Sequence, residues 1–472
     1  MKINLFYQTM TLHLLDAIIK ISCLRLLIVK KVSFFQVALN NYFSRIKLFM
    51  NEEFLHHIWK FRLFDQLDLK TTSGDLVEIE KTGEHNFDAG PDFFNGKIKI
   101  GNTLWAGNVE VHINASDWKK HFHQHDKAYD NIILHVVNNA DIPLYRTSGE
   151  AIPTIEIKDR IGNKLHQNYL NFKSSNDWIP CEKQIAFVPE LIVNSMLDRL
   201  LLERLERKSK TITDCLSLNN NNWEETFYQL LARNFGFKTN AEPFELLAKS
   251  LPSKILAKHK SSLLQIEALL FGQAGLLDRH FEDKYPQALQ NEYSFLKQKF
   301  KLDSVDEHLW KFLRLRPVNF PSVRIAQFAN LIFNSSHLFS KMIEAEKFED
   351  VKELMNVHVS EYWETHYVFD KPVKKKMKHL GDEAINNILI NTIVPFLFVY
   401  GKQKGEEKYV DRAINFLEQI NGESNSIITK WESLKLPVKT AYSTQALLQL
   451  KNEYCNHKKC LNCSIGNYLL KN

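Results

Sequence analysis

Two patterns of hydrophobic and polar positions follow one another along the chain. Apolar residues recur at helical spacing over residues 51–63, and strict alternation, typical of half-buried strands, then begins. Gly101 and Asn102 predict a tight hairpin turn between two of the strands. The predicted order is α-β-β-β-α-β with one more strand. Its helices cover residues 51–63 and 116–129, and its strands cover 76–80, 93–100, 104–113, 131–137 and 152–157.

Helical periodicity dominates from Cys181 onward, and strand patterns become scarce. Gly272 and Gly275 follow no predicted strand, which favours close packing of helices over a phosphate-binding loop. Helices are predicted over residues 191–209, 223–235, 263–277, 292–300, 323–333, 384–400 and 409–420. The chain is therefore expected to be an α+β protein, with an α/β domain over residues 50–180 and an α-helical domain over residues 181–472.

The first 49 residues carry all of the formal net charge of +6, because they hold seven Lys and Arg residues and a single acid, Asp16. The remainder is neutral, so net charge does not argue for a nucleic-acid partner. Lys20 and Arg25 interrupt the apolar run, and no cleavage site follows it, so neither a membrane span nor a signal peptide is expected. We interpret residues 1–49 as a poorly ordered upstream extension and Met50 as the start.

The chain contains six cysteines, 44% hydrophobic residues and 25% charged residues, as in globular proteins. Without a secretory signal, a disulfide framework is improbable in a chain of 472 residues. A cytoplasmic protein with reduced thiols and no membrane partner is therefore expected.

Two acids are placed where neighbouring strands are predicted. Asp92 begins the strand at residues 93–100, whereas Glu110 and His112 share one face of the next strand because they lie two residues apart. Neighbouring strands run about 4.8 Å apart, so both carboxylates can reach one divalent cation, Mg²⁺ or Mn²⁺. The alternative is a turn aspartate and a solvent-facing glutamate.

Histidines form a second candidate site. His121 and His125 share a face if residues 116–129 are helical, and His112 and His135 lie on the flanking strands. Imidazole ligands favour Zn²⁺, iron or Mn²⁺ over Mg²⁺. The alternative is a polar helix face with a buried, hydrogen-bonded His135.

Cysteines cluster at the C-terminus as Cys455, Cys460 and Cys463. Three thiols at this spacing favour Zn²⁺ or an iron–sulfur cluster, with Cys181 or His457 as the fourth ligand. Reduced structural cysteines are the alternative.

Arginines flank a proline-bounded turn, with Arg314 and Arg316 before it and Arg324 in the next helix. These side chains can grip phosphates of DNA or RNA, with Phe320 available to stack on a base. A structural role, through bonds to helix ends or to Glu267, is the alternative.

The segment from Met50 resembles the PD-(D/E)XK nuclease-like fold in element order and in the placement of its acids. In this resemblance Asp92 and Glu110 match the family's acids, Glu53 matches an accessory acid, and His112 stands where the family has Lys. It implies a restriction-endonuclease-like domain with metal-dependent cleavage of nucleic acid. Some nucleases of this superfamily also bind a cluster through one distant cysteine and three C-terminal ones, an arrangement similar to the one proposed for Cys181.

Seven segments are similar to an uncharacterised bacterial family, the domain of unknown function 2851. The segments lie at residues 53–59, 88–93, 107–112, 115–118, 134–137, 316–321 and 460–463. This similarity runs from near residue 50 to the end and implies no activity.

The leading hypothesis is a metal-dependent phosphodiesterase that acts on nucleic acid. In it, Asp92 and Glu110 bind the cation, and His112 positions water or the phosphate. Two alternatives stay open: a catalytically inactive nuclease-like module that binds nucleic acid or protein, and a hydrolase with a histidine-bound metal. The oligomeric state is not predicted.

Overall fold

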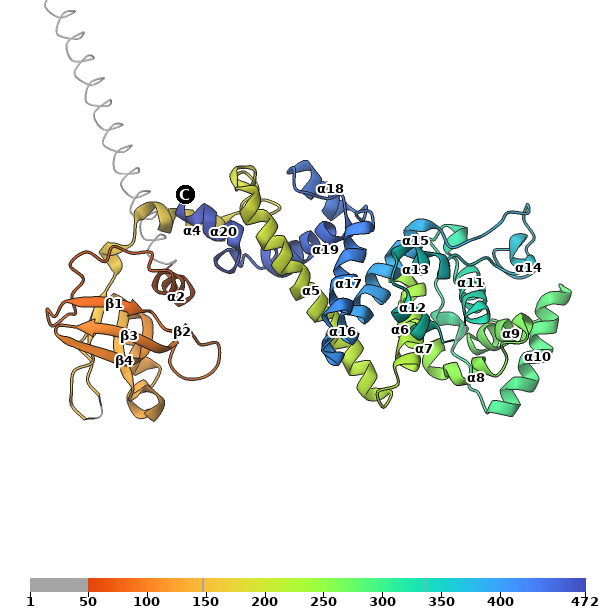
Figure 1. The fold of residues 1–472 in the computed structure, drawn as a ribbon, viewed down its shortest axis with the longest axis horizontal. Coiled ribbons are helices and arrows are strands. Elements are labelled where there is room, and N and C mark those ends of the chain that lie inside the picture. The colour runs from red at the N-terminus through yellow and green to blue at the C-terminus, as the bar shows by residue number, and fades with distance from the viewer. Residues whose placement is uncertain (1–49, 147, 336) are drawn as a thin grey trace, which may run out of the picture. The chain divides into compact units, whose positions relative to one another are not determined.

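The computed structural model describes residues 50–146, 148–335 and 337–472 (Figure 1). The predictions for residues 1–49 lie outside the described residues. The chain forms two compact units. The first contains the chain up to Cys181 together with Cys460–Asn462 and Gly466–Asn472, and the second contains Glu182–Lys459 and Cys463–Ile465.

A six-stranded sheet forms the centre of the first unit. Its main path runs in the order β1-β3-β4-β5-β6, and β2 pairs with the start of β3. β1, β3 and β4 are antiparallel neighbours, whereas β4, β5 and β6 are parallel. The strands are β1 (Val77–Lys81), β2 (Glu84–His85), β3 (Phe93–Ile100), β4 (Thr103–Asn114), β5 (Ile132–Asn139) and β6 (Thr154–Glu156).

The first helix, α2 (Glu52–Lys60), packs against β4. Asn51 begins it by accepting a 3.0 Å hydrogen bond from the backbone N–H of Phe54, which satisfies one of the open donors of the first turn. The helix buries Phe54, Leu55, Ile58 and Trp59, which are the apolar positions of the predicted helix. The ring of Phe54 stacks on Tyr169 of α4 (Asn163–Ser174), with ring centroids 4.3 Å apart.

The predicted helix over residues 116–129 is wrong beyond its first turn. Only α3 (Asp117–Lys120) is α-helical, because Phe122 adopts the left-handed region with a φ of 63°. Two 3₁₀ turns, η1 (His123–His125) and η2 (Lys127–Tyr129), replace the rest. Trp118 and Tyr129 pack in one cluster with Ile132 and Val137 of β5, which holds this segment against the sheet.

The main elements of the second unit are helices (Figure 1). The prediction over 223–235 is confirmed to the residue, and that over 384–400 is divided by the π-helical turn η7 (Leu389–Ile393). The helices are α5 (Glu190–Leu218), α6 (Trp223–Phe235), α7 (Phe237–Ser250), α8 (Ser253–Ala257), α9 (Leu263–Gln273), α10 (Lys284–Phe300), α11 (Pro321–Asn334), α12 (Leu338–Glu344), α13 (Phe348–Leu354), α14 (Glu361–Glu364), α15 (Asp382–Ile388), α16 (Val394–Lys404), α17 (Glu407–Gln419), α18 (Ser426–Ser433) and α19 (Ala441–Gln449). The last helix of the chain, α20 (Ser464–Lys471), returns to the first unit from Gly466 onward.

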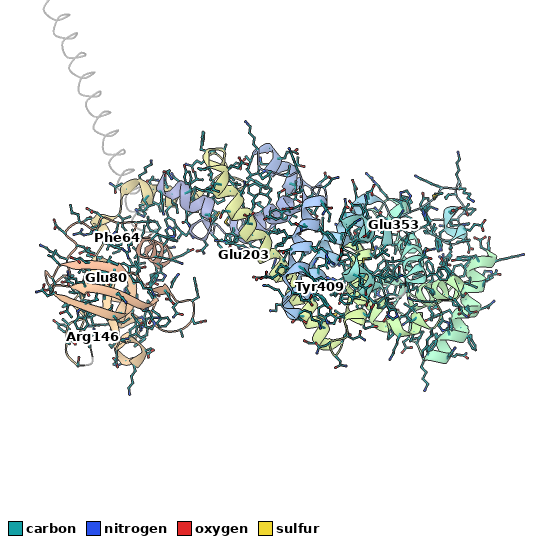
Figure 2. The ribbon with its side chains drawn as sticks, viewed as in Figure 1. Phe64, Glu80, Arg146, Glu203, Glu353 and Tyr409 are labelled. Atoms are coloured by element: carbon teal, nitrogen blue, oxygen red, sulfur yellow. The ribbon has the colours of Figure 1, made fainter. Side chains whose placement is uncertain are left out.

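Large side chains fill the interior of the helical unit (Figure 2). Gly272 of α9 lies directly against the ring of Tyr293 from α10, so close that a β-carbon on it would lie 2.1 Å from the ring. The predicted role of the glycines in helix packing is thereby confirmed for Gly272.

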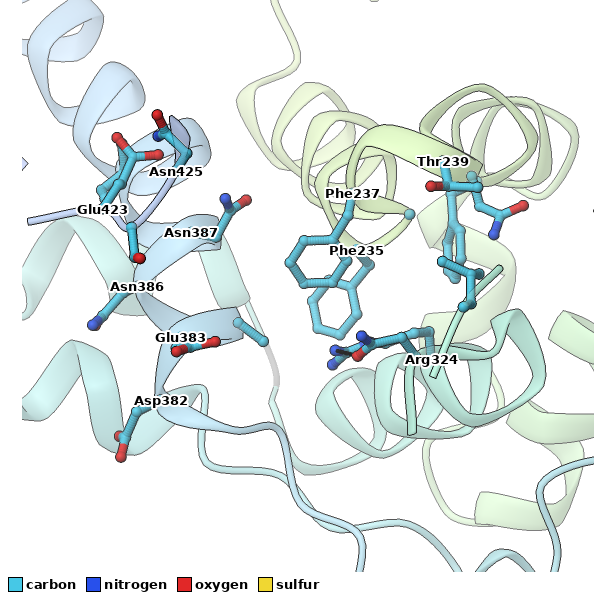
Figure 3. A pocket seen from close by; sticks show the side chains of 18 of the residues that line it. Phe235, Phe237, Thr239, Arg324, Asp382, Glu383, Asn386, Asn387, Glu423 and Asn425 are labelled. Carbon is cyan, nitrogen blue, oxygen red and sulfur yellow. Dashed lines mark hydrogen bonds between the residues drawn. The ribbon is translucent and has the colours of Figure 1, made fainter. Parts of the chain in front are cut away.

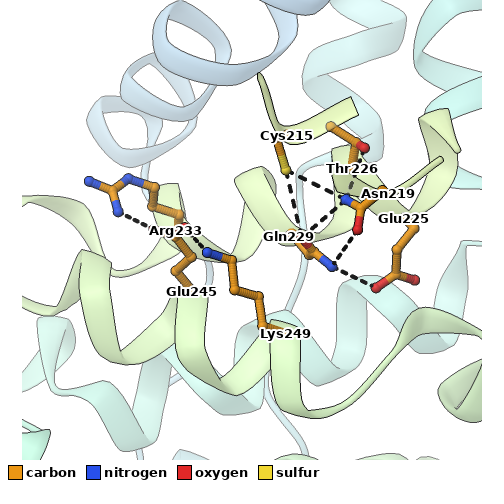
Figure 4. Close-up of polar contacts among 8 residues, drawn as sticks. All are labelled: Cys215, Asn219, Glu225, Thr226, Gln229, Arg233, Glu245 and Lys249. Atoms are coloured by element: carbon orange, nitrogen blue, oxygen red, sulfur yellow. Dashed lines mark hydrogen bonds and ion pairs between the residues drawn. The ribbon is translucent and has the colours of Figure 1, made fainter. Parts of the chain in front are cut away.

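Polar contacts join the end of α5 to α6 and α7 (Figure 4). Asn219 donates hydrogen bonds to Thr226 (3.0 Å) and to Gln229 (3.2 Å). Glu245 of α7 pairs with Arg233 of α6 and with Lys249, the latter at 2.6 Å. Burial raises the pKa of the nearby Cys215 thiol, so this cysteine stays protonated and structural.

The helical stretch Asp382–Lys404 is long and apolar enough to cross a membrane, judged by length and composition alone. Of its most apolar window, 78% is buried inside the unit. Core helices of globular proteins share these properties, so the stretch gives weak evidence for a membrane span.

Candidate metal centre

Asp92 and Glu110 meet where β3 begins beside β4. The backbone N–H of Asp92 donates to Oε2 of Glu110 (3.1 Å), and the N–H of Val111 donates to Oδ2 of Asp92 (3.0 Å). Glu110 is only 3% exposed. Burial, together with the charge of Asp92, raises the pKa of Glu110 to about 9. The two predicted acids therefore lie side by side, with one of them deeply buried.

Two histidines lie beside the other oxygen of Glu110, and a third adjoins one of them. Its Oε1 lies 3.3 Å from Nε2 of His123 and 3.5 Å from Nε2 of His112. His112 Nε2 in turn lies 3.1 Å from Nδ1 of His121. One nitrogen from each of the three imidazoles lies within 4.8 Å of the other two. Strand β4 and the turn after α3 thus bring three imidazoles together, and two of them also lie beside a carboxyl oxygen of Glu110.

The buried Nε2 of His123 makes no hydrogen bond with any described residue, despite its nearness to Glu110. His123 Nε2 and Glu110 Oε1 lie close together, but their geometry is not that of a hydrogen bond. Two ligands of one cation lie close together in the same way. An unpaired buried polar atom costs free energy, and a bound metal would remove that cost.

His135 of β5 contacts Nδ1 of His112, the ring nitrogen that does not lie beside Glu110. Its Nε2 lies 2.9 Å from Nδ1 of His112, and the two residues are 0% and 2% exposed. Burial and the neighbouring imidazoles lower the pKa of His112 to about 2 and that of His135 to about 3, so both rings are neutral at pH 7. A neutral imidazole whose second nitrogen is hydrogen-bonded is the usual form of a metal-binding histidine.

Helix α2 contributes Glu52 and His56, which share a face because they lie four residues apart. His56 Nε2 lies 3.1 Å from Oδ2 of Asp92. Burial alone would lower the pKa of His56, but the contact with Asp92 outweighs it and leaves the pKa raised. Burial raises the pKa of Glu52. These two residues border the acids.

Glu53 does not belong to this site, contrary to the prediction. Its side chain is exposed and pairs with Lys173 of α4 at 3.2 Å. One residue along a helix rotates a side chain by about 100°, so Glu52 occupies the face that the prediction gave to Glu53.

His125 is also misplaced in the prediction, because it is exposed and lies outside the imidazole cluster. The left-handed Phe122 ends the helix, and His123 takes the position beside His112 and Glu110. Phenylalanine rarely adopts this conformation, so the sequence held no signal for the break.

The donor set consists of imidazole nitrogens and one carboxylate oxygen. Such a set suits Zn²⁺, Mn²⁺ or Fe²⁺ better than Mg²⁺, which prefers oxygen ligands alone. The predicted acid site and the predicted histidine site have His112 in common, and Glu110 lies beside both His112 and His123, so they form one candidate centre.

The cysteines of the predicted cluster lie at ends of elements. Cys455 ends the π-helix η8 (Leu450–Cys455), and Cys460 begins the 3₁₀ turn η9 (Cys460–Asn462). Cys463 is buried and directly precedes α20. Cys181 is the last residue of the long N-terminal segment that belongs to the first unit. Zinc or an iron–sulfur cluster at these thiols stays a prediction.

The three predicted arginines differ in their surroundings. Arg314 and Arg316 are exposed, whereas Arg324 is 7% exposed in α11. Arg324 donates to Asn319 (2.6 Å) and Gln327 (3.0 Å), so it does not share the surface of the other two. The predicted alternative pairing with Glu267 is absent among the described residues, because this buried carboxylate accepts from the hydroxyls of Tyr285 and Ser360 instead.

Comparisons with known proteins place the chain in a family without supplying an activity. No curated protein and no solved structure gave a significant match. A family model described as "Protein of unknown function (DUF2851)" matches residues 52–426. This match covers well over half of the chain, which therefore belongs to the DUF2851 family.

Proposed function

We propose that the first unit is a metal-dependent phosphodiesterase that acts on nucleic acid. The observation that carries this proposal is the convergence of Glu110 Oε1 with Nε2 of both His112 and His123, within 3.5 Å. A buried carboxyl group beside neutral imidazoles has the composition of a transition-metal site.

Glu110, His112, His121 and His123 would hold the metal. A bound Zn²⁺, Mn²⁺ or Fe²⁺ would supply a nucleophilic water of lowered pKa and polarise a phosphoryl oxygen. His135 keeps the ring of His112 oriented through their 2.9 Å contact. At this site Glu110 would exchange its proton for the cation, because the same carboxyl group can bind either one.

His56 and Asp92 supply the remaining chemistry beside the metal ligands. Asp92 orients the imidazole of His56 through their 3.1 Å contact. His56 can then donate a hydrogen bond to a phosphoryl oxygen or pass a proton to the leaving oxygen. Glu52 lies on the same face of α2 as His56.

The choice of a phosphodiester substrate is supported by the order of elements. α2, an antiparallel β1-β3-β4 arrangement, α3 and a parallel β5 follow the order of the PD-(D/E)XK nuclease-like fold. In the resemblance, Asp92 and Glu110 correspond to that family's acids. His112 replaces its lysine, and the extra histidines change the preferred metal rather than remove metal binding.

The test is cleavage by the purified full-length protein, stripped of metal and reloaded separately with Mg²⁺, Mn²⁺, Zn²⁺ or Fe²⁺. Plasmid DNA, single-stranded DNA, RNA and bis(p-nitrophenyl) phosphate serve as substrates. We expect turnover with a transition metal, and a loss of roughly 10²–10⁴-fold in Glu110→Gln and His112→Gln.

Glu53→Gln and His125→Gln are matched controls, because each alters the same residue type nearby but outside the centre. Both should retain activity. Nucleic-acid binding without turnover under every metal, unchanged in Glu110→Gln, would instead establish an inactive binding module.

A further inference from the structure

A cavity of about 710 Å³ lies within the second unit (Figure 3). α7 and α11 form one wall, and α15 with the segment before α18 forms the other. Its lining residues fall between Phe235 and Asn425, so it is separate from the metal centre. A cavity of this size accommodates a small organic molecule.

One wall holds a buried positive charge without a counter-ion. Among the described residues, the guanidinium of Arg324 bonds only to the neutral amides of Asn319 and Gln327, and it lies over the ring of Phe237 at 4.7 Å. Its Nε is buried without a hydrogen-bond partner, and no carboxylate of the described residues forms an ion pair with it. An unpaired buried cation is costly, and an anionic group in the cavity would offset that cost.

Aromatic rings lie beside this charge. The half-buried ring of Phe237 lies over the guanidinium of Arg324 (Figure 3), whereas Phe235 and Phe244, which also line the cavity, are 0% exposed. An aromatic ring at such a place favours a flat, weakly polar group. A nucleobase is one such group, because its face can pack on the ring.

The opposite wall is polar. α15 contributes Asp382, Glu383, Asn386 and Asn387 to the lining, and the segment before α18 contributes Glu423 (Figure 3). The side-chain amide of Asn386 makes no hydrogen bond with a described residue, so both its donor and its acceptor are available. Amides bond to base edges, and a carboxylate accepts from ribose hydroxyls or exocyclic amines.

From these walls we propose that the cavity binds one nucleotide, with its phosphate at Arg324 and its base and ribose towards α15. A single guanidinium flanked by neutral amides suits one phosphate group, and the volume suits one nucleotide rather than a longer strand. The same chemistry is offered by a free nucleoside monophosphate and by the terminal nucleotide of a strand. This inference does not rest on the proposed phosphodiesterase.

The experiment is isothermal titration of the full-length protein with adenosine and uridine 5′-monophosphates, a short single-stranded oligonucleotide, inorganic phosphate and citrate. Arg324→Gln removes the charge. Thr239→Trp blocks the cavity from an exposed lining residue, so it remains informative if Arg324→Gln fails to fold. Lys238→Trp is the control, because its exposed side chain does not line the cavity.

We expect mononucleotide or oligonucleotide binding in the wild type and in Lys238→Trp, weakened at least about tenfold in Arg324→Gln and Thr239→Trp. Preference for the mononucleotide would indicate a free ligand, and preference for the oligonucleotide would indicate a strand end. Glu110→Gln should bind as the wild type does, which separates this site from the metal centre. Absence of nucleotide binding, binding in both cavity variants as tight as in the wild type, or citrate binding as tightly as a nucleotide would overturn the proposal.

Discussion

The backbone N–H of Asp92 donates a 3.1 Å hydrogen bond to Oε2 of Glu110 and so ties the two acids of neighbouring strands together. Since Oε2 is engaged there, Oε1 faces His112 and His123. A sheet in which these acids pointed to opposite faces could not have formed the centre.

Metal content should depend on the imidazole cluster. Replacement of Glu110, His112 or His123 by Gln should lower the bound transition metal by about one equivalent per chain, because each change removes a ligand from a small set. Elemental analysis of the purified protein measures this. His125→Gln is the control and should keep the metal, and unchanged content in all three ligand variants would contradict the assignment.

The cysteine cluster should contribute metal of its own. Cys460→Ser is expected to remove zinc or iron that Glu110→Gln leaves in place, since a thiolate ligand is lost. Visible absorption of anaerobically purified protein distinguishes a coloured iron–sulfur cluster from colourless zinc. Cys215→Ser serves for comparison, because that thiol contacts Gln229 within the helical unit. Equal metal in Cys460→Ser and the wild type would refute the cluster.

Gly272→Ala should destabilise the second unit. The added methyl group would overlap the ring of Tyr293, whose hydroxyl is held by Gln273 at 3.0 Å. Overpacking of this kind costs about 1–3 kcal/mol of the free energy of unfolding, measured by urea denaturation. Gly381→Ala should change far less, because no atom lies within 4 Å of the new β-carbon. Similar losses in both variants would argue against this packing account.

Stability of the second unit should fall as the pH rises through the range set by Glu267. Burial raises the pKa of this carboxyl from 4.5 to about 7, although the hydroxyls of Tyr285 and Ser360 oppose the shift. The folded state therefore holds the proton more tightly than the unfolded state. Below pH 4.5 the contribution of this group to the free energy of unfolding does not change with pH. Between about pH 4.5 and 7 the contribution declines, because the unfolded state releases the proton first.

The full decline from Glu267 is about 3 kcal/mol, as an upper figure. Urea denaturation at pH 5 and pH 8 measures it. Glu267→Gln should lose this part of the pH dependence, whereas the exposed Glu407→Gln should keep it. A wild-type slope in Glu267→Gln would show that the carboxyl is ionised in the folded state at both pH values.

Local patterns sufficed for most elements of the fold. Strand β3 and helix α6 occur at the predicted residues, because alternation and helical spacing of apolar side chains reflect burial directly. The same alternation placed Glu110 and His112 on one face of β4. The hairpin at Gly101, with a φ of 57°, follows from the freedom of glycine in the left-handed region.

The sequence by itself thus determined the order of elements, the pairing of Asp92 with Glu110 and the candidate ligand types. Only the tertiary structure decided that His123 rather than His125 joins them, because Phe122 adopts the left-handed region and ends the helix, a break that helical periodicity does not register. It also decided that Arg324 is enclosed beside Phe237 instead of exposed with Arg316. Periodicity reports which side of an element is buried, but which groups meet there depends on how the elements pack.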